Sequence, residues 1–166
     1  MFTPDLDDPQ DALRFLAHPL RSVHDALDDG VSFAELTLAA LPRDPHLWSH
    51  LTRYHAWHYL HGLGPQPWCL VKLANSGIQI EYEPIVVRVL KRFGSGPPHP
   101  GASAARRGFY GQQSLPLAWG EITIPASGAN LIIDWGVESQ TRIALALSKP
   151  IGTWRYGGQP KLQWRC

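Results

Sequence analysis

The stretch Asp44–Gly64, DPHLWSHLTRYHAWHYLHGLG, determines how the rest of the chain is interpreted. Asp44 followed by Pro45 is typical of a helix start. The carboxylate can accept hydrogen bonds from the first-turn N–H groups, and proline at the first helical position loses no hydrogen bond. Gly62 and the following Gly64-Pro65 pair favour the end of the helix. The sequence therefore predicts one helix over residues 44–62.

This helix has an unusual composition, because it holds five of the chain's eight histidines together with two tryptophans and two tyrosines. Apolar and aromatic side chains occur all around its circumference, which is typical of a helix that is buried or forms an interface. The helix is too short and too polar to span a bilayer. We expect its contact surface to include Trp48, Tyr54, Trp57, His58 and His61.

Three interpretations of the histidines are possible. Imidazoles spaced three and four residues apart can converge on a metal ion, and one of them, His58 or His61, can act as a general acid or base. No HExxH motif is present, and no carboxylate or cysteine follows Asp44 within the helix. We therefore favour the interpretation that these histidines are core or interface residues, and we expect no metal ion or other cofactor.

The preceding residues predict a helical lobe over residues 1–64, with three or four short helices. His18-Pro19 is expected to interrupt the first helix, because a residue before proline avoids the helical region. The Asp29-Gly30 turn is expected to end the second. Ser32 and Glu35 have the spacing of a capping box, which predicts a third helix start.

After Pro67 the hydrophobic period changes towards two, which predicts a β domain over residues 65–166. About seven or eight strands are expected, and residues 94–116, rich in glycine and proline, are predicted to be one long loop. The fold class is therefore α+β: a mainly antiparallel sheet, sandwich or partly open barrel with helices on one face or end. The expected strands lie at 68–73, 78–82, 85–90, 119–124, 130–137, 142–147, 153–156 and 161–164.

The net charge of +1 conceals an asymmetry. Residues 1–48 contain nine acidic and three basic residues, whereas residues 49–166 contain five acidic and twelve basic ones. Arginines interleaved with aromatic rings are typical of single-stranded nucleic-acid grooves. The sequence therefore predicts an RNA-binding or single-stranded DNA-binding protein, with phosphate contacts from Arg88, Lys91, Arg92, Arg106, Arg107 and Arg155 and stacking by Phe109 and Tyr110.

Two other functions stay open. The Trp- and His-rich helix can dock a protein partner, either as an interaction or inhibitor module or within a larger assembly. The second open function is that of a small His-dependent hydrolase or nuclease. A catalytic triad of Cys69, His99 and Asp134 is one form of it, but a structural role for Cys69 is favoured over that triad. We expect binding rather than catalysis. Two cysteines, no secretory signal and no transmembrane run predict a cytoplasmic protein that does not act at a membrane.

Overall fold

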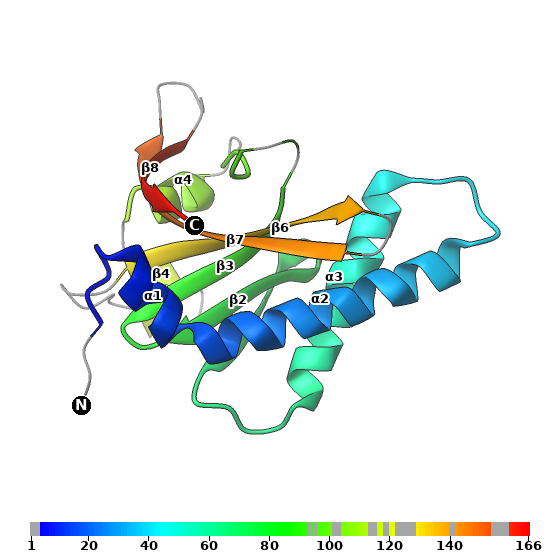
Figure 1. Cartoon of the computed structure of the whole chain (residues 1–166), viewed down its shortest axis with the longest axis horizontal. Helices are drawn as coiled ribbons and strands as arrows, with labels where there is room; N and C mark the ends of the chain where they lie inside the picture. Colours follow the sequence, from blue (N-terminus) through cyan, green and yellow to red (C-terminus); the bar gives the residue numbers. More distant parts are fainter. Residues whose placement is uncertain are drawn as a thin grey trace.

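The computed structural model describes residues 4–92, 94, 96–100, 104–112, 116–117, 120–121, 129–139, 142–153 and 160–166. Within these ranges the chain forms four α-helices and a six-stranded sheet, so the α+β class is confirmed (Figure 1). The helices are α1 (Pro9–Phe15), α2 (Ala17–Leu38), α3 (Pro45–Gly62) and α4 (Ala104–Tyr110). The main strands are β1 (Cys69–Leu73), β2 (Gly77–Tyr82), β3 (Ile85–Lys91), β6 (Ala129–Ser139), β7 (Arg142–Thr153) and β8 (Pro160–Arg165).

The sheet is open and mixed, with strand order β1-β2-β3-β6-β7-β8. Neighbouring strands are antiparallel except for β3 and β6, which run parallel. A parallel pair needs a crossover connection, and here the connection contains α4 and the short hairpin of β4 (Pro116–Leu117) and β5 (Gly120–Glu121). The prediction of seven or eight strands in an antiparallel sheet, sandwich or barrel was therefore correct only at the level of fold class. The predicted long loop contains a helix, α4.

The α2 helix replaces the two short helices expected after residue 19. Pro19 is the third residue of α2, where its missing N–H has no partner within the helix. Gly30 is buried inside α2, and a Cβ atom there would lie 2.4 Å from the Thr52 carbonyl oxygen. The Ser32 hydroxyl donates to the Asp28 carbonyl and does not cap a new helix. Gly30 thus serves close packing between helices and does not form a turn.

The α3 helix begins as predicted. The Asp44 carboxylate accepts hydrogen bonds from the backbone N–H groups of His46 and Leu47, at 2.8 and 3.1 Å. Its buried side is formed by residues four apart, Trp48, Thr52, Ala56 and Leu60, which pack towards α2 and the sheet.

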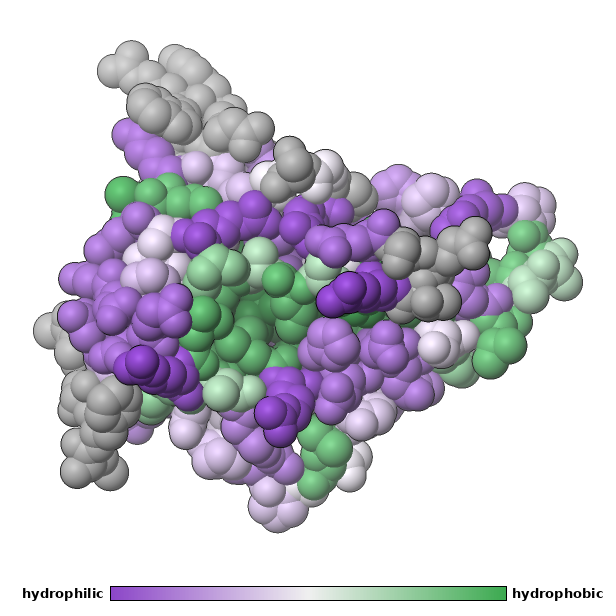
Figure 2. Space-filling model, viewed as in Figure 1, coloured by the Kyte–Doolittle hydropathy of each residue, from purple (hydrophilic) through white to green (hydrophobic). Residues whose placement is uncertain are grey.

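The two faces of the sheet are covered differently. The larger core joins α2 and α3 to alternating residues such as Val87, Val89, Leu131 and Ile133. On the opposite face, Phe109 and Tyr110 of α4 pack on Ile132. Figure 2 shows hydrophobic residues gathered between α2 and β7, surrounded by polar ones. None of the helices in the described ranges has the length and apolar character needed to cross a membrane.

Candidate functional site

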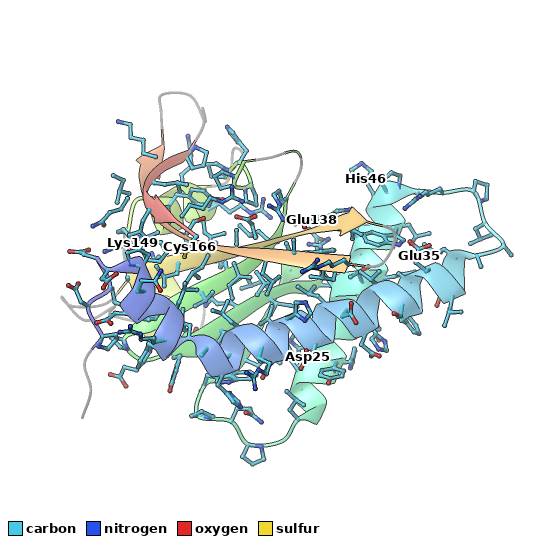
Figure 3. The ribbon with its side chains drawn as sticks, viewed as in Figure 1. Asp25, Glu35, His46, Glu138, Lys149 and Cys166 are labelled. Carbon is cyan, nitrogen blue, oxygen red and sulfur yellow. The ribbon has the colours of Figure 1, made fainter. Side chains whose placement is uncertain are left out.

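Two cavities adjoin where the start of α3, the end of β3 and the segment after β3 come together. They share Lys91, the last residue of β3, and have volumes of about 450 and 850 Å³. Figure 3 shows His46 at the start of α3 and Glu138 near the end of β6, both at this end of the molecule. We refer to the smaller one as the basic cavity and to the larger one as the mixed cavity.

The basic cavity is formed by four separate parts of the chain. Helix α3 contributes His46, Ser49 and Arg53, β3 contributes Leu90 and Lys91, the segment after β3 contributes Gly96, Pro97, Pro98 and His99, and α4 contributes Arg106. Five of these residues have basic side chains. None of the described residues that line this cavity is acidic.

Local structure explains how these side chains converge. His46, Ser49 and Arg53 are spaced three and four residues apart, so they share one face of α3. The Arg53 Nε donates to the Ser49 carbonyl at 3.2 Å, which directs the guanidinium along this face. The Tyr110 hydroxyl donates to the Pro98 carbonyl and ties the segment beside His99 to α4.

Like charges lie close together around this cavity. Burial lowers the pKa of the Arg53 guanidinium, and repulsion from Arg106 lowers it further. Burial also lowers the pKa of the Lys91 ammonium group, with added repulsion from Arg53 and Arg43. Such crowding of partly buried cations disfavours the charged forms, whereas an anion among them favours those forms. The arrangement is therefore suited to holding a phosphate or another anion.

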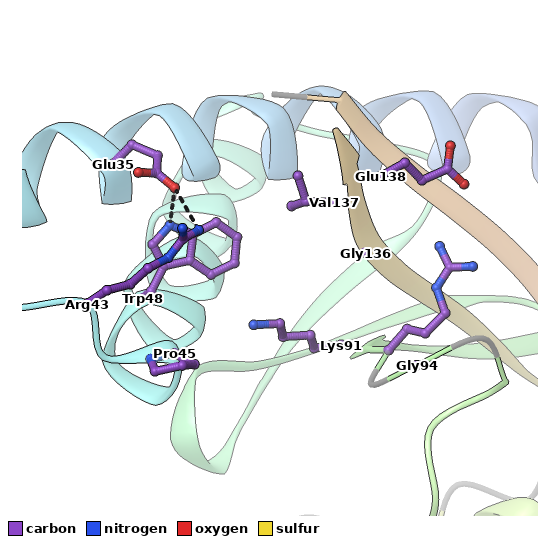
Figure 4. A pocket seen from close by; sticks show the side chains of 10 residues that line it. Glu35, Arg43, Pro45, Trp48, Lys91, Gly94, Gly136, Val137 and Glu138 are labelled. Atoms are coloured by element: carbon purple, nitrogen blue, oxygen red, sulfur yellow. Dashed lines mark hydrogen bonds and ion pairs between the residues drawn. The ribbon is translucent and has the colours of Figure 1, made fainter. Parts of the chain in front are cut away.

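The mixed cavity has a different character because it contains two carboxylates, Glu35 and Glu138. Glu35 accepts a hydrogen bond from Trp48 Nε1 at 2.9 Å and lies 3.8 Å from Arg43. Figure 4 shows Lys91 extending into the space between Pro45 and Val137, with Glu35 and Glu138 at opposite sides. The positive charge is thus concentrated in the basic cavity and offset in the mixed one. The remaining lining residues are Arg92, Gly94 and Gly136.

Two of the predicted phosphate contacts are instead parts of the fold. Arg88 is only 8% exposed; its Nε donates to Gln79 Oε1 at 3.1 Å, and its guanidinium carbon lies 4.4 Å from the centre of the Phe109 ring. Arg92 lies 3.4 Å from the Asp134 carboxylate and donates to the Ala144 carbonyl at 3.3 Å.

Asp134 is fully buried and binds a second arginine. Arg165 Nη2 donates to both of its carboxylate oxygens, at 2.8 and 3.1 Å. Burial raises the pKa of the Asp134 carboxyl, and the charges of Arg165 and Arg92 oppose that rise. The Asp134 carboxylate is engaged by these arginines, and strands β2 and β3 lie between its strand, β6, and β1, which carries Cys69. The Cys69, His99 and Asp134 triad is therefore not assembled.

The predicted stacking residues also have another role. Phe109 and Tyr110 are 0% and 1% exposed, because α4 presses both rings against the sheet. Neither offers a face to a base, so the stacking prediction is wrong for this structure. Both adjacent arginines on α4 are exposed, but only Arg106 lines the basic cavity, and Arg107 is not among its lining residues. Arg155 lies outside the described residues.

The predicted interface residues fall into two groups. Trp48 belongs to the core and lies 6.1 Å from Trp135, measured between ring centres. The other four form what we call the aromatic face of α3: Trp57 stacks on His61 at 5.0 Å, and Tyr54 lies 4.5 Å from His58. Lys72 of β1 lies over the Trp57 ring at 4.4 Å. In the described ranges, no three His, Cys, Asp or Glu side chains are placed to hold a metal ion together.

Sequence reasoning identified Lys91 and Arg106 but missed His46, Arg53 and His99 as members of the same site. The spacing of His46 and Arg53 on one helix face was visible in the sequence. Their meeting with His99 and Arg106 depends on the crossover connection, which no local pattern revealed. Comparison of the chain with protein-family models, curated proteins and solved structures gave no match.

Proposed function

We propose that the protein binds single-stranded nucleic acid, RNA or DNA, and that the basic cavity holds a backbone phosphate. The observation that supports this most strongly is the convergence of Arg53, Lys91 and Arg106 on one cavity with no acidic residue among its described lining. Guanidinium groups offer forked donors that match phosphate oxygens, and an ammonium group adds a compact charge. Lys91 and Arg106 belong to the predicted contact set, and Arg53 is added to it.

A single strand suits this cavity better than a duplex. The three cations lie around a recess of about 450 Å³ and not along an open ridge. A flexible strand can turn a phosphate into a recess, whereas the phosphates of a duplex are fixed on the outside of a stiff cylinder. The preference for single strands therefore follows from the shape of the site, without the buried rings of Phe109 and Tyr110.

Fluorescence anisotropy with labelled RNA, single-stranded DNA and duplex DNA over a salt series tests this proposal. We expect single strands to bind more tightly than duplex and the binding to weaken steeply with salt. Arg106→Gln should weaken binding more than Arg107→Gln, which removes the same charge from the next residue of α4. Absence of binding to any of the three at low salt would refute the proposal.

A second candidate function is docking of a protein partner on the aromatic face of α3. Tyr54 is 43% exposed, and the imidazoles of His58 and His61 on the same face are exposed as well. Aromatic side chains with a polar edge are typical of binding hot spots.

Affinity capture with the wild-type chain and a Tyr54→Ala, Trp57→Ala variant tests this candidate. A partner that is lost by this variant, yet retained by Arg53→Gln, Arg106→Gln, would assign the aromatic face to protein binding. A partner retained by both variants would argue against it.

A further inference from the structure

Two histidines line the basic cavity, and the role that we infer for them rests on the proposed function and goes beyond binding. His46 comes from the first turn of α3 and His99 from the segment before α4, so the two imidazoles approach the cavity from different parts of the chain. Both are solvent-exposed, and neither belongs to the aromatic face of α3, which contains His58 and His61. The sequence had indicated His58 or His61 as the acid–base candidate, whereas the cavity contains the other pair.

The cavity has room for a phosphate group. Its volume is about 450 Å³, and both imidazoles belong to its lining. Arg53, Lys91 and Arg106 line the same space and can stabilise negative charge on the phosphate oxygens. One cavity therefore contains two proton-transfer groups and three cations.

We infer that the basic cavity cleaves RNA without a metal ion, by attack of a ribose 2′-hydroxyl on the adjacent phosphorus. One imidazole of the His46–His99 pair, in its neutral form, accepts the 2′-hydroxyl proton as the 2′-oxygen forms its bond to phosphorus. The other, in its protonated form, donates a proton to the 5′-oxygen as the bond from phosphorus to that oxygen breaks. The products are a 2′,3′-cyclic phosphate and a free 5′-hydroxyl, and solvent restores the two protonation states.

The cations act on the charge that develops at phosphorus. The five-coordinate transition state carries more negative charge on its non-bridging oxygens than the starting diester does. Preorganised guanidinium and ammonium groups stabilise that charge. DNA lacks the 2′-hydroxyl, so a DNA strand is expected to bind and to stay intact. RNA is therefore expected to be a substrate, whereas a DNA strand is expected to bind the same cavity without cleavage and to act as an inhibitor.

The test uses a labelled RNA oligonucleotide and the same oligonucleotide with 2′-deoxyriboses throughout, both incubated with the full chain in the presence of a chelator. Anisotropy with the deoxy strand measures binding, and electrophoresis with mass spectrometry of the RNA products measures cleavage. The variants are His46→Gln and His99→Gln, with His50→Gln as the control, because His50 is an exposed histidine of α3 that does not line the cavity. All are purified by the same route, so that a contaminating ribonuclease would appear equally in each.

We expect RNA to yield a 2′,3′-cyclic phosphate, with each cavity variant slowed by at least about 100-fold and the control unchanged. The rate should have a bell-shaped dependence on pH, because one imidazole must be neutral while the other is protonated, and either cavity variant should lose one side of the bell. Intact RNA with normal binding of the deoxy strand would overturn the inference and leave the proposed function standing. Cleavage that both cavity variants retain would overturn it as well. Absence of binding to either strand would overturn both.

Discussion

Replacing Gly30 with alanine tests the packing that positions the candidate site. A Cβ atom at residue 30 would lie 2.4 Å from the Thr52 carbonyl oxygen, and 3.0 Å is the closest approach that real Cβ atoms make. Because this obstacle is backbone, α3 must move by at least 0.6 Å. Overpacking of this kind costs about 3 kcal/mol, whereas alanine gains only about 1 kcal/mol of helix propensity over glycine. We expect Gly30→Ala to lower the free energy of unfolding by about 2 kcal/mol.

Urea unfolding followed by circular dichroism measures this change. The matched control is Gly62→Ala in the last turn of α3, where an added Cβ meets nothing within 4 Å, so no loss of stability and a gain of up to about 1 kcal/mol are expected. The shift of α3 should also weaken nucleic-acid binding, since α3 contributes His46 and Arg53 to the basic cavity. A Gly30→Ala variant as stable as the wild type would refute the packing of α2 on α3 described here.

Three further predictions concern single side chains. Asp134→Asn should lower the free energy of unfolding by about 3 kcal/mol in urea unfolding, because it leaves Arg92 and Arg165 without their buried carboxylate; no loss would contradict the ion-pair geometry. Asp44→Ala should destabilise the chain at neutral pH, because the helix N–H groups lower the pKa of the Asp44 carboxyl. The stabilisation by the Asp44 carboxylate is fully present above the ordinary pKa of aspartate and is lost as the pH falls through the lowered pKa. The difference in stability between variant and wild type should therefore vanish at strongly acidic pH. A difference that persists there would contradict this role of the Asp44 carboxylate. Tyr110→Phe should cost about 1 kcal/mol of stability and weaken nucleic-acid binding a few-fold, since it removes the hydrogen bond to Pro98 beside His99; unchanged affinity in anisotropy would show that this bond does not position the cavity.

Local signals in the sequence were sufficient for α3 and for most strands. The Asp44 cap and Pro45 act within one helical turn, so their effect does not depend on the rest of the fold. Pro19 was predicted to interrupt a helix and Gly30 to end one, but both lie within α2. Proline and glycine each occur in two kinds of structural setting that the local sequence does not distinguish. Proline in a first helical turn is tolerated, and glycine can allow close approach of two helices as readily as it allows a turn.

The candidate site was only partly predictable, because its members are distant in sequence. Lys91 and Arg106 were found from charge and composition, but composition cannot distinguish Arg88, which is buried under Phe109, from an exposed phosphate contact. The burial of Phe109 and Tyr110 follows from the position of α4 on the second face of the sheet. That position depends on the parallel pairing of β3 and β6, a long-range feature that strand periodicity does not encode.

The salt dependence of binding to a single-stranded 2′-deoxy oligonucleotide, measured for charge-matched variants, tests the central claim most directly. One variant combines Arg53→Gln with Arg106→Gln inside the basic cavity, and the other combines Arg14→Gln with Arg107→Gln outside its lining. Each phosphate contact to a single strand contributes about 0.7 to the slope of log K against log salt. The account predicts a slope reduced by about 1.4 for the first variant and nearly unchanged for the second. Equal reductions in the two variants would show that binding follows overall charge and that the basic cavity is not its site.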